Sequence, residues 1–302
     1  MEDPILLHCQ AVIERGSRSF SRAAALLPPE SRTGAYLLYA WCRHCDDVAD
    51  GQELGTVTPG TRLPQHVFQA RLDDLRARTE RVLAGGTDEL LVFQGLGRIV
   101  KQFGIPHRHP RELLDGMVMD VEARRYQTLD ELAVYCYHAA GVVGVMMAHI
   151  MGIRDSATLK RAEDLGIAFQ LTNIARDIKD DAAMGRVYLP LDWLQEANLA
   201  VEAVQSAAAN PQLAVLVGRL LETAEQHYAA VDRGIGHLPF RQAWAMSAAR
   251  YIYSDIGRAI VERGPNAWDR RAFVSGLRKT RWVLVSLFKT IGRATWSSSP
   301  PG

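Results

Sequence analysis

Two pairs of aspartates, each four residues apart, are the residues of this sequence best suited to chemistry. One pair is Asp46 and Asp50, in YAWCRHCDDVAD, and the other is Asp177 and Asp181, in NIARDIKDD. Residues four apart lie one above the other on a helix, so each pair stacks two carboxylates that repel each other. A hard divalent cation such as Mg²⁺ relieves that repulsion and binds one or two carboxylates together with phosphate oxygens. Each pair therefore predicts half of a magnesium site, and a phosphate-bearing ligand would supply the other half.

Further polar residues extend each pair along the same helical face. Tyr39 and Arg43 precede the first pair at helical spacing, and Gln170 and Asn173 precede the second. Two helices with polar stripes and otherwise apolar faces predict a wet pocket inside a helical bundle. A solvated charged face is the competing interpretation of either motif alone. The repetition of the pattern on two helices favours the pocket.

The sequence predicts that the elements positioning these residues are all helices. Residues 51–64 are a loop rich in Gly and Pro, and no segment alternates with period two. The stretch 132–153 is the most apolar, and its uninterrupted apolar run, 139–148, is too short to span a bilayer. It predicts a central bundle helix. Further helices are predicted over 5–15, 31–49, 65–84, 88–103, 157–182, 191–207, 211–233, 238–263 and 270–293. The predicted fold class is therefore all-α, with one domain over 1–302, a core over about 5–293 and a disordered tail over 294–302.

The composition argues against a general nucleic-acid binder, a secreted disulfide-rich protein and a thiol redox enzyme. The 302 residues include 35 basic and 34 acidic ones, a formal charge of +1, which gives no sign of a general nucleic-acid binder. The N-terminal residues lack the basic start and long apolar core of a signal peptide. Four cysteines are too few for a disulfide framework, which indicates a reducing cytosol. Two of them, Cys42 and Cys45, form a CxxC, but the aspartates that follow disfavour a redox thiolate.

Four strings of the sequence, in order, resemble the squalene/phytoene synthase family. They are SRSF from Ser17, YAWCRHCDDVAD, YCYHAAGVVG and GIAFQLTNIARDIKDDAAMGRVYLP. The likeness runs from about Ser17 to Val274 and is closest to the bacterial phytoene synthases of carotenoid pathways. The resemblance implies an isoprenoid-synthase helical bundle with a central cavity.

The resemblance also implies roles for the residues at matching positions. It implies Mg²⁺, with Mn²⁺ as the alternative ion, on Asp46, Asp50, Asn173, Asp177 and Asp181. The four aspartates and Tyr135, which would lie near the reacting carbons, are the catalytic candidates. The residues expected to contact substrate are Ser17, Ser19, Phe20, Tyr39, Arg43, Gln170, Asn173, Arg186, Tyr253 and Arg271. For the turn from Ser17 to Phe20, a helix cap with a surface arginine is an equally good interpretation.

The activity that the resemblance implies is head-to-head condensation of two geranylgeranyl diphosphates. The reaction would pass through prephytoene diphosphate to phytoene, release diphosphate and need no NADPH. One alternative is a squalene or dehydrosqualene synthase that uses farnesyl diphosphate. A terpene cyclase and a catalytically dead assembly partner are further alternatives. The residues leave open the substrate chain length, the double-bond geometry, the number of metal ions and the oligomeric state.

The last predicted helix, 270–293, suggests where the protein works. It carries seven basic residues and no acidic one, with Trp282, Leu284, Val285, Phe288 and Ile291 between them. Phytoene is insoluble in water, so we expect a cytoplasmic protein that binds a membrane surface peripherally through this helix. Packing of the same apolar residues on the core is the competing interpretation. Contact with neighbouring carotenoid-pathway enzymes is a further expectation, and no nucleic acid is expected as a partner.

Overall fold

A computed structural model describes residues 3–53, 56–57, 65–206, 210–235 and 238–297. Within these ranges, the side chains of 18–19, 52–53, 56–57, 65, 205–206 and 293–297 lie outside the description. The described chain is helical except for turns, connecting segments and one short antiparallel ribbon, β1 (Gln52–Glu53) with β2 (Thr56–Val57). The all-α prediction is confirmed, and the ribbon falls in the segment predicted as loop. The chain divides into two compact units, and each is described by itself.

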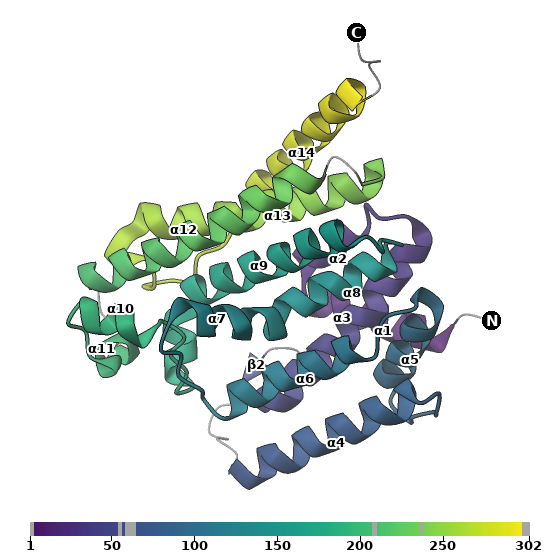
Figure 1. Cartoon of the computed structure of the whole chain (residues 1–302), viewed down its shortest axis with the longest axis horizontal. Coiled ribbons are helices and arrows are strands. Elements are labelled where there is room, and N and C mark those ends of the chain that lie inside the picture. Colours follow the sequence, from purple (N-terminus) through teal and green to yellow (C-terminus); the bar gives the residue numbers. More distant parts are fainter. Residues whose placement is uncertain (1–2, 54–55, 58–64, 207–209, 236–237, 298–302) are drawn as a thin grey trace. The chain divides into compact units, whose positions relative to one another are not determined.

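The first unit comprises residues 1–122 and 142–159 and is built around α3 (Pro29–Asp50). Pro29 suits the first turn of this helix, and Gly51 ends it in the left-handed conformation, with φ 64°. Trp41 is fully buried on it. The helix packs against α1, α5, α6 and α8, as Figure 1 shows. The other helices are α1 (Pro4–Gly16), α2 (Arg18–Ala24), α4 (Gln65–Leu83), α5 (Leu91–Phe103), α6 (Arg108–Val121) and α8 (Val142–Ile150).

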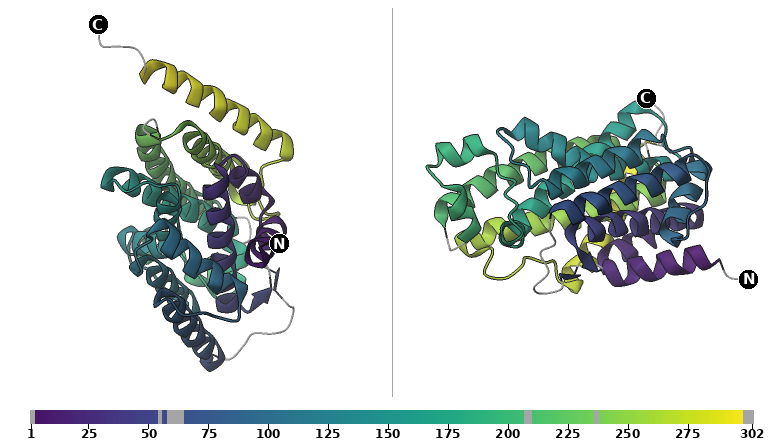
Figure 2. Two further views of the ribbon diagram at one scale, coloured as in Figure 1. Left: turned by 90° about the vertical axis from the view of Figure 1, so that its right-hand side faces the viewer. Right: turned by 90° about the horizontal axis from the view of Figure 1, so that it is seen from below.

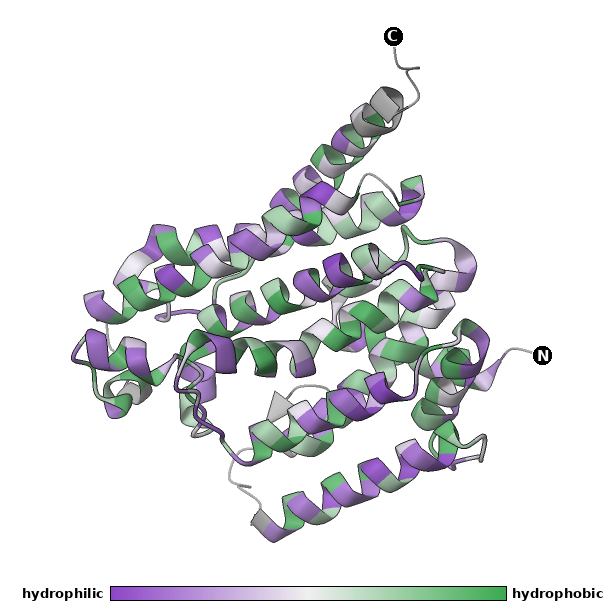
Figure 3. Cartoon of the chain, viewed as in Figure 1, coloured by the Kyte–Doolittle hydropathy of each residue, from purple (hydrophilic) through white to green (hydrophobic). Residues whose placement is uncertain are grey.

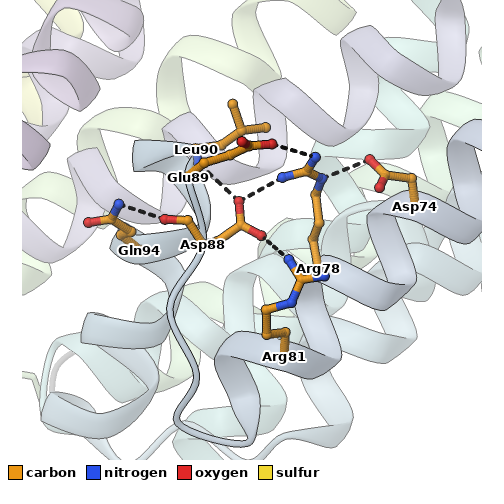
Figure 4. A network of polar contacts seen from close by, with 7 residues as sticks. All are labelled: Asp74, Arg78, Arg81, Asp88, Glu89, Leu90 and Gln94. Carbon is orange, nitrogen blue, oxygen red and sulfur yellow. Dashed lines mark hydrogen bonds and ion pairs between the residues drawn. The ribbon is translucent and has the colours of Figure 1, made fainter.

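A buried aspartate fixes the turn between α4 and α5 (Figure 4). The Asp88 carboxylate accepts hydrogen bonds from Arg78 Nη1 at 2.8 Å and from Arg81 Nη1 at 2.7 Å. It also accepts one from the backbone N–H of Leu90, at 2.9 Å, just before α5 begins. Both oxygens of this carboxylate thus have charged donors, as burial of an ionised group requires. Its role is structural.

The second unit comprises residues 123–141 and 160–302. Its α12 and α13 run side by side, and α14 packs along α13 (Figures 1 and 2). A Cβ atom on Gly166 would lie 2.3 Å from the carbonyl oxygen of Ala140, so only glycine lets α9 approach that backbone. The helices are α7 (Leu129–Cys136), η1 (Tyr137–Gly141), α9 (Ser156–Ala183), α10 (Leu191–Glu196), α11 (Val201–Ser206), α12 (Pro211–Gly234), α13 (Phe240–Arg263), η3 (Gly264–Asn266) and α14 (Gly276–Ser297).

Three predicted elements differ from the structure. The helix predicted over 191–207 is two short helices, with Asn198 at a positive φ of 52° between them. The last helix begins at Gly276 rather than 270, and the Ser275 hydroxyl accepts a hydrogen bond from the Arg278 N–H in its first turn. Arg270 and Arg271 therefore precede the helix. At its other end α14 continues to Ser297, so residues 294–297, predicted as part of a disordered tail, are helical. The rest of that predicted tail, 298–302, lies outside the described residues.

The apolar stretch predicted as one central helix is interrupted by the π-helical turn η1, which separates α7 from α8. By length and composition alone, the combined segment Leu129–Ile150 is long and apolar enough to cross a membrane. Half of its most apolar window is buried inside the protein, and a core helix passes the same test. This segment is therefore weak evidence for a membrane span.

Candidate active site

The predicted site residues on α3, in the first unit, lie on one face of the helix and are all partly buried. They are Tyr39, Arg43, Asp46 and Asp50. Arg43 Nη1 lies 3.9 Å from Asp46 Oδ2 and 4.0 Å from Asp47 Oδ1, beyond hydrogen-bond length. The guanidinium thus offsets these charges only in part. The Arg43 Nε atom is buried and has no hydrogen-bond acceptor among the described residues. This side chain is therefore placed to donate to an added anion.

Asp46 lies where negative charge accumulates. Its withdrawal from water, together with the nearby charges of Asp50 and Asp120, raises the pKa of Asp46 to about 7, although Arg43 opposes the shift. Asp120, near the end of α6, was not predicted from the sequence, because no other carboxylate lies three or four residues away from it. A cation at this position would relieve the repulsion.

An aromatic pair packs at the start of the same face. The rings of Tyr39 and Phe20 stack with centroids 5.5 Å apart, and Arg43 Cζ lies 5.8 Å from the centre of the Tyr39 ring. Ser17 caps α2 by accepting a hydrogen bond from the Phe20 N–H at 3.3 Å. The capping interpretation is thus observed, while phosphate binding by this turn stays a prediction. The Ser19 side chain lies outside the description.

The polar face of α9, in the second unit, has an ordered hydrogen-bond chain. Asn173 Nδ2 donates to Gln170 Oε1 at 3.4 Å, and Gln170 Nε2 donates to the Tyr135 hydroxyl, also at 3.4 Å. These bonds use the amide nitrogen of Asn173 and leave its Oδ1 oxygen as the remaining acceptor. That oxygen is buried and accepts no hydrogen bond from any described residue. A buried, unsatisfied amide oxygen one turn before Asp177 is a suitable ligand for a hard cation.

Two arginines hold the Asp177 carboxylate. Arg271 donates to it through Nε and Nη2, each at 2.9 Å, and Arg176 donates through Nε at 2.9 Å and also through Nη2. Burial alone would raise the pKa of Asp177, but the bonds from Arg176 and the charge of both arginines lower it. The structure thus brings the predicted Arg271 to the acidic face. Arg176 was missed, because its position on the helical wheel lies off that face.

Tyr135 belongs to a buried aromatic cluster. Its ring lies 4.9 Å from that of Tyr188 and 5.4 Å from that of Tyr126, and its hydroxyl donates to the Tyr188 hydroxyl at 3.2 Å. Tyr126 and Tyr188 were not predicted, although Tyr188 lies in the GRVYLP string. Of the other candidates, Tyr253 packs on Phe169 with ring centroids 4.2 Å apart. The backbone N–H of Arg186 donates to the Asp181 carbonyl at 2.9 Å, just past α9.

The donor set suits Mg²⁺ on either helix. The candidates offer only carboxylate and amide oxygens, the ligands that hard cations prefer. Among the described residues, no group of three or more His, Cys, Asp or Glu side chains could hold a metal ion alone. One or two carboxylates per ion, completed by diphosphate oxygens, need no such group. The repelled Asp46 and the unsatisfied Asn173 oxygen both fit this arrangement.

The chain is similar in sequence to known proteins of one family. A sequence model of the squalene/phytoene synthase family matches residues 13–278. The 15-cis-phytoene synthase of Paracoccus sp. (strain N81106 / MBIC 01143) is 46% identical over 279 residues, which cover 92% of this chain and 89% of that protein. The 15-cis-phytoene synthase of Pantoea ananas is 42% identical, with 95% and 92% covered.

Solved structures show the same fold. The crystal structure of a dehydrosqualene synthase in complex with ligand aligns with a TM-score of 0.83 at 25% identity, covering 95% of this chain and 97% of that one. A squalene synthase from Alicyclobacillus acidocaldarius aligns with a TM-score of 0.74 at 23% identity, covering 86% and 94%, and supports the fold alone. The family match spans most of the chain and includes both acidic helices. The chain therefore belongs to the squalene/phytoene synthase family.

Proposed function

We propose that this protein is a phytoene synthase, a prenyltransferase that joins two geranylgeranyl diphosphates head to head. The intermediate is prephytoene diphosphate, and diphosphate is released. The observation that carries this proposal is the 40–46% identity to several bacterial phytoene synthases over most of each chain. The helical faces that would bind two diphosphates retain all four aspartates.

We propose further that the site uses Mg²⁺ or Mn²⁺, held by Asp46, Asp50, Asn173, Asp177 and Asp181. When bound, the ion neutralises a diphosphate and so helps it to leave. Arg43 binds diphosphate oxygens through the Nε–H that has no partner among the described residues. The Tyr135, Tyr188 and Tyr126 rings form a wall that excludes water, and their faces attract positive charge. The reaction is expected to need no NADPH.

Product analysis tests this function. The full chain is incubated with Mg²⁺ and either the C20 or the C15 diphosphate, with and without NADPH, and the hydrocarbon is identified by mass spectrometry. We expect phytoene from the C20 substrate in both conditions. A product from the C15 substrate alone would instead identify a dehydrosqualene or squalene synthase, the activities named for two solved structures of this fold. No hydrocarbon from either substrate would contradict the proposal.

Arg43 offers a test of diphosphate binding. We expect Arg43→Lys to lose about tenfold to a hundredfold in kcat/KM, about 1.4–2.7 kcal/mol, because lysine keeps the charge but not the bidentate fork. Steady-state kinetics with the C20 substrate measures the loss, and Arg15→Lys, an exposed arginine on α1, is the control. Equal activity of the two variants would show that only a point charge matters at position 43.

A membrane contact is proposed for α14, whose apolar side faces solvent. Leu277 is 87% exposed and Phe288 69%, and Leu284 and Ile291 continue the same helical stripe. The opposite side of the helix, with Ser286 and Thr290, is buried. Hydrophobic and hydrophilic residues are both present along this ribbon (Figure 3). We define the apolar stripe as Leu277, Leu284, Phe288 and Ile291. Its exposure supports lipid binding over the competing interpretation of core packing.

The basic residues of α14 have two roles in this proposal. Arg278 Nη2 donates to the buried Asp255 at 2.6 Å, and Lys289 Nζ donates to the Tyr251 hydroxyl at 3.0 Å. These bonds dock α14 on α13, so charge reversal at Arg278 would disturb the helix itself. Arg281 lies on the stripe side, with Cζ 5.5 Å from the Trp282 ring centre. Each basic group near an anionic leaflet contributes about 1 kcal/mol.

Vesicle sedimentation tests this contact. We expect Leu284→Gln/Phe288→Gln to lower binding to phosphatidylglycerol vesicles by about tenfold or more, because two exposed apolar anchors are lost. Val215→Gln, a 70% exposed valine on α12, is the matched control. Unchanged vesicle binding would contradict the proposal. If the double variant instead turned a dimer into a monomer, the stripe would be an interface with a second copy.

A further inference from the structure

The Asp177 carboxylate is fully occupied by two guanidinium groups. An ionised carboxylate has two oxygens and about four positions for hydrogen-bond donors. Arg176 and Arg271 each give one N–H to Oδ1 and one to Oδ2. No position is left for a cation. The three groups together carry a net charge of +1, which repels an approaching divalent ion.

The two arginines differ in how firmly they are held. Arg176 lies on α9 directly before Asp177, and its side chain is only 16% exposed. Arg271 lies on the irregular segment 267–275, and its side chain is 60% exposed. An exposed ion pair contributes little, about 0–1 kcal/mol at the median, whereas separating a buried one is costly. Arg271 is therefore the partner that can leave.

The backbone that carries Arg271 is anchored beside α9. Trp268 Nε1 donates to the Ala175 carbonyl at 3.0 Å, and Trp268 and Ala272 are both buried. The segment is thus fixed within reach of Asp177 while the Arg271 side chain extends over the surface. A side chain released from Asp177 would stay close to any anion bound at this face. A guanidinium fork suits phosphate oxygens as well as it suits a carboxylate.

We propose that Arg271 is an exchangeable counter-ion of Asp177. It holds the carboxylate in the metal-free protein and releases it when a divalent cation and diphosphate bind, and its guanidinium then pairs with the diphosphate. Arg176 remains on Asp177 as a positioning residue. This inference rests on the proposed function, because it needs a divalent cation at Asp177. By linkage, Arg271 opposes metal binding without diphosphate and favours diphosphate binding once the metal is bound.

Metal binding in the absence of substrate tests the exchange. Mn²⁺ binding to the full chain is measured by electron paramagnetic resonance, and binding of inorganic diphosphate at saturating Mn²⁺ by calorimetry. We expect Arg271→Gln to bind Mn²⁺ about five- to tenfold more tightly than the unaltered protein and diphosphate about tenfold more weakly. Arg270→Gln, the exposed neighbour, is the matched control and should change neither. In an Asp177→Asn background, Arg271→Gln should no longer change Mn²⁺ binding, because the carboxylate for which Arg271 and Mn²⁺ compete is absent.

The outcomes separate this inference from the function on which it rests. Unchanged or weaker Mn²⁺ binding by Arg271→Gln, in a protein that makes phytoene, would overturn the exchange alone. A tighter Mn²⁺ site that persists in the Asp177→Asn background would also overturn it, since the competition would then lie elsewhere. Failure of the unaltered protein to bind Mn²⁺ at all would overturn both the exchange and the proposed metal dependence.

Discussion

Asp177→Asn is expected to reduce hydrocarbon formation at least about a thousandfold while leaving the helical fold in place. The amide keeps the shape of the side chain but not the negative charge that pairs with two arginines and that, under the proposed function, binds a cation once Arg271 has left. Loss of a group that stabilises charge in the transition state typically costs about 10²–10³ in kcat, and under the proposed function a metal ligand is lost as well. Product formation at saturating Mg²⁺ is the measurement, with the exposed neighbour Asp180→Asn as control.

The same substitution should also destabilise the protein. Arg176 is 16% exposed and would lose its carboxylate partner, and breaking a buried ion pair costs about 3–5 kcal/mol. Asp177 is 14% exposed, so we expect the lower end of that range. Repulsion between two stacked carboxylates, considered alone, would give the opposite sign, a more stable variant. Near-normal turnover, or a melting temperature equal to that of Asp180→Asn, would contradict the role assigned to Asp177.

The stabilising effect of the Asp177 carboxylate should also depend on pH. The arginines lower the pKa of Asp177, so its unfolded form takes up a proton at higher pH than its folded form. Its contribution to stability is therefore present above the unfolded pKa of about 3.9 and is lost as pH falls through the folded pKa. Asp177→Asn should lose most stability at neutral pH and progressively less towards pH 3.

The helical parts of the site could be predicted because they depend on local periodicity. Spacings of three and four residues place Gln170, Asn173, Asp177 and Asp181 on one face of α9 whatever surrounds the helix. The same holds for the face of α3. The 3.6-residue period predicted this helix over 31–49, and α3 runs from Pro29 to Asp50.

The partners of those faces could not be predicted, because they depend on long-range packing. Arg271 reaches Asp177 from 94 positions away, and the sequence placed it in a helix that in fact begins five residues later. The contact of Arg176 with Asp177 was not predicted, because a helical wheel does not show that a long side chain can bend to reach the next residue. Asp120 approaches Asp46 only through the packing of α6 on α3. Charge balance at each carboxylate is thus a tertiary property.

Asp46→Asn should abolish turnover to a similar degree but stabilise the metal-free protein, the opposite of Asp177→Asn. Asp46 lies near Asp50 and Asp120, and Arg43 approaches it no closer than 3.9 Å. Its side chain is 41% exposed, so solvent screens much of the repulsion. A gain of about 1 kcal/mol at pH 8, about 2–4 °C in melting temperature, is the expected result for the variant.

The pH profile identifies the cause of that gain. Because the pKa of Asp46 is raised to about 7, from about 3.9 in an unfolded chain, the folded state binds more protons between these values. The stability of the unaltered protein therefore falls as pH rises from about 4 to 7, and the cost is complete above pH 7. Melting temperatures of Asp46→Asn and the unaltered protein should differ at pH 8 and converge towards about pH 4. With added Mg²⁺ and diphosphate at pH 8, the unaltered protein should have the higher melting temperature. The reason is that only its Asp46 carboxylate can bind a cation, which would relieve the repulsion. A variant less stable than the unaltered protein at pH 8 without metal would show that Asp46 is held by partners rather than repelled by neighbours.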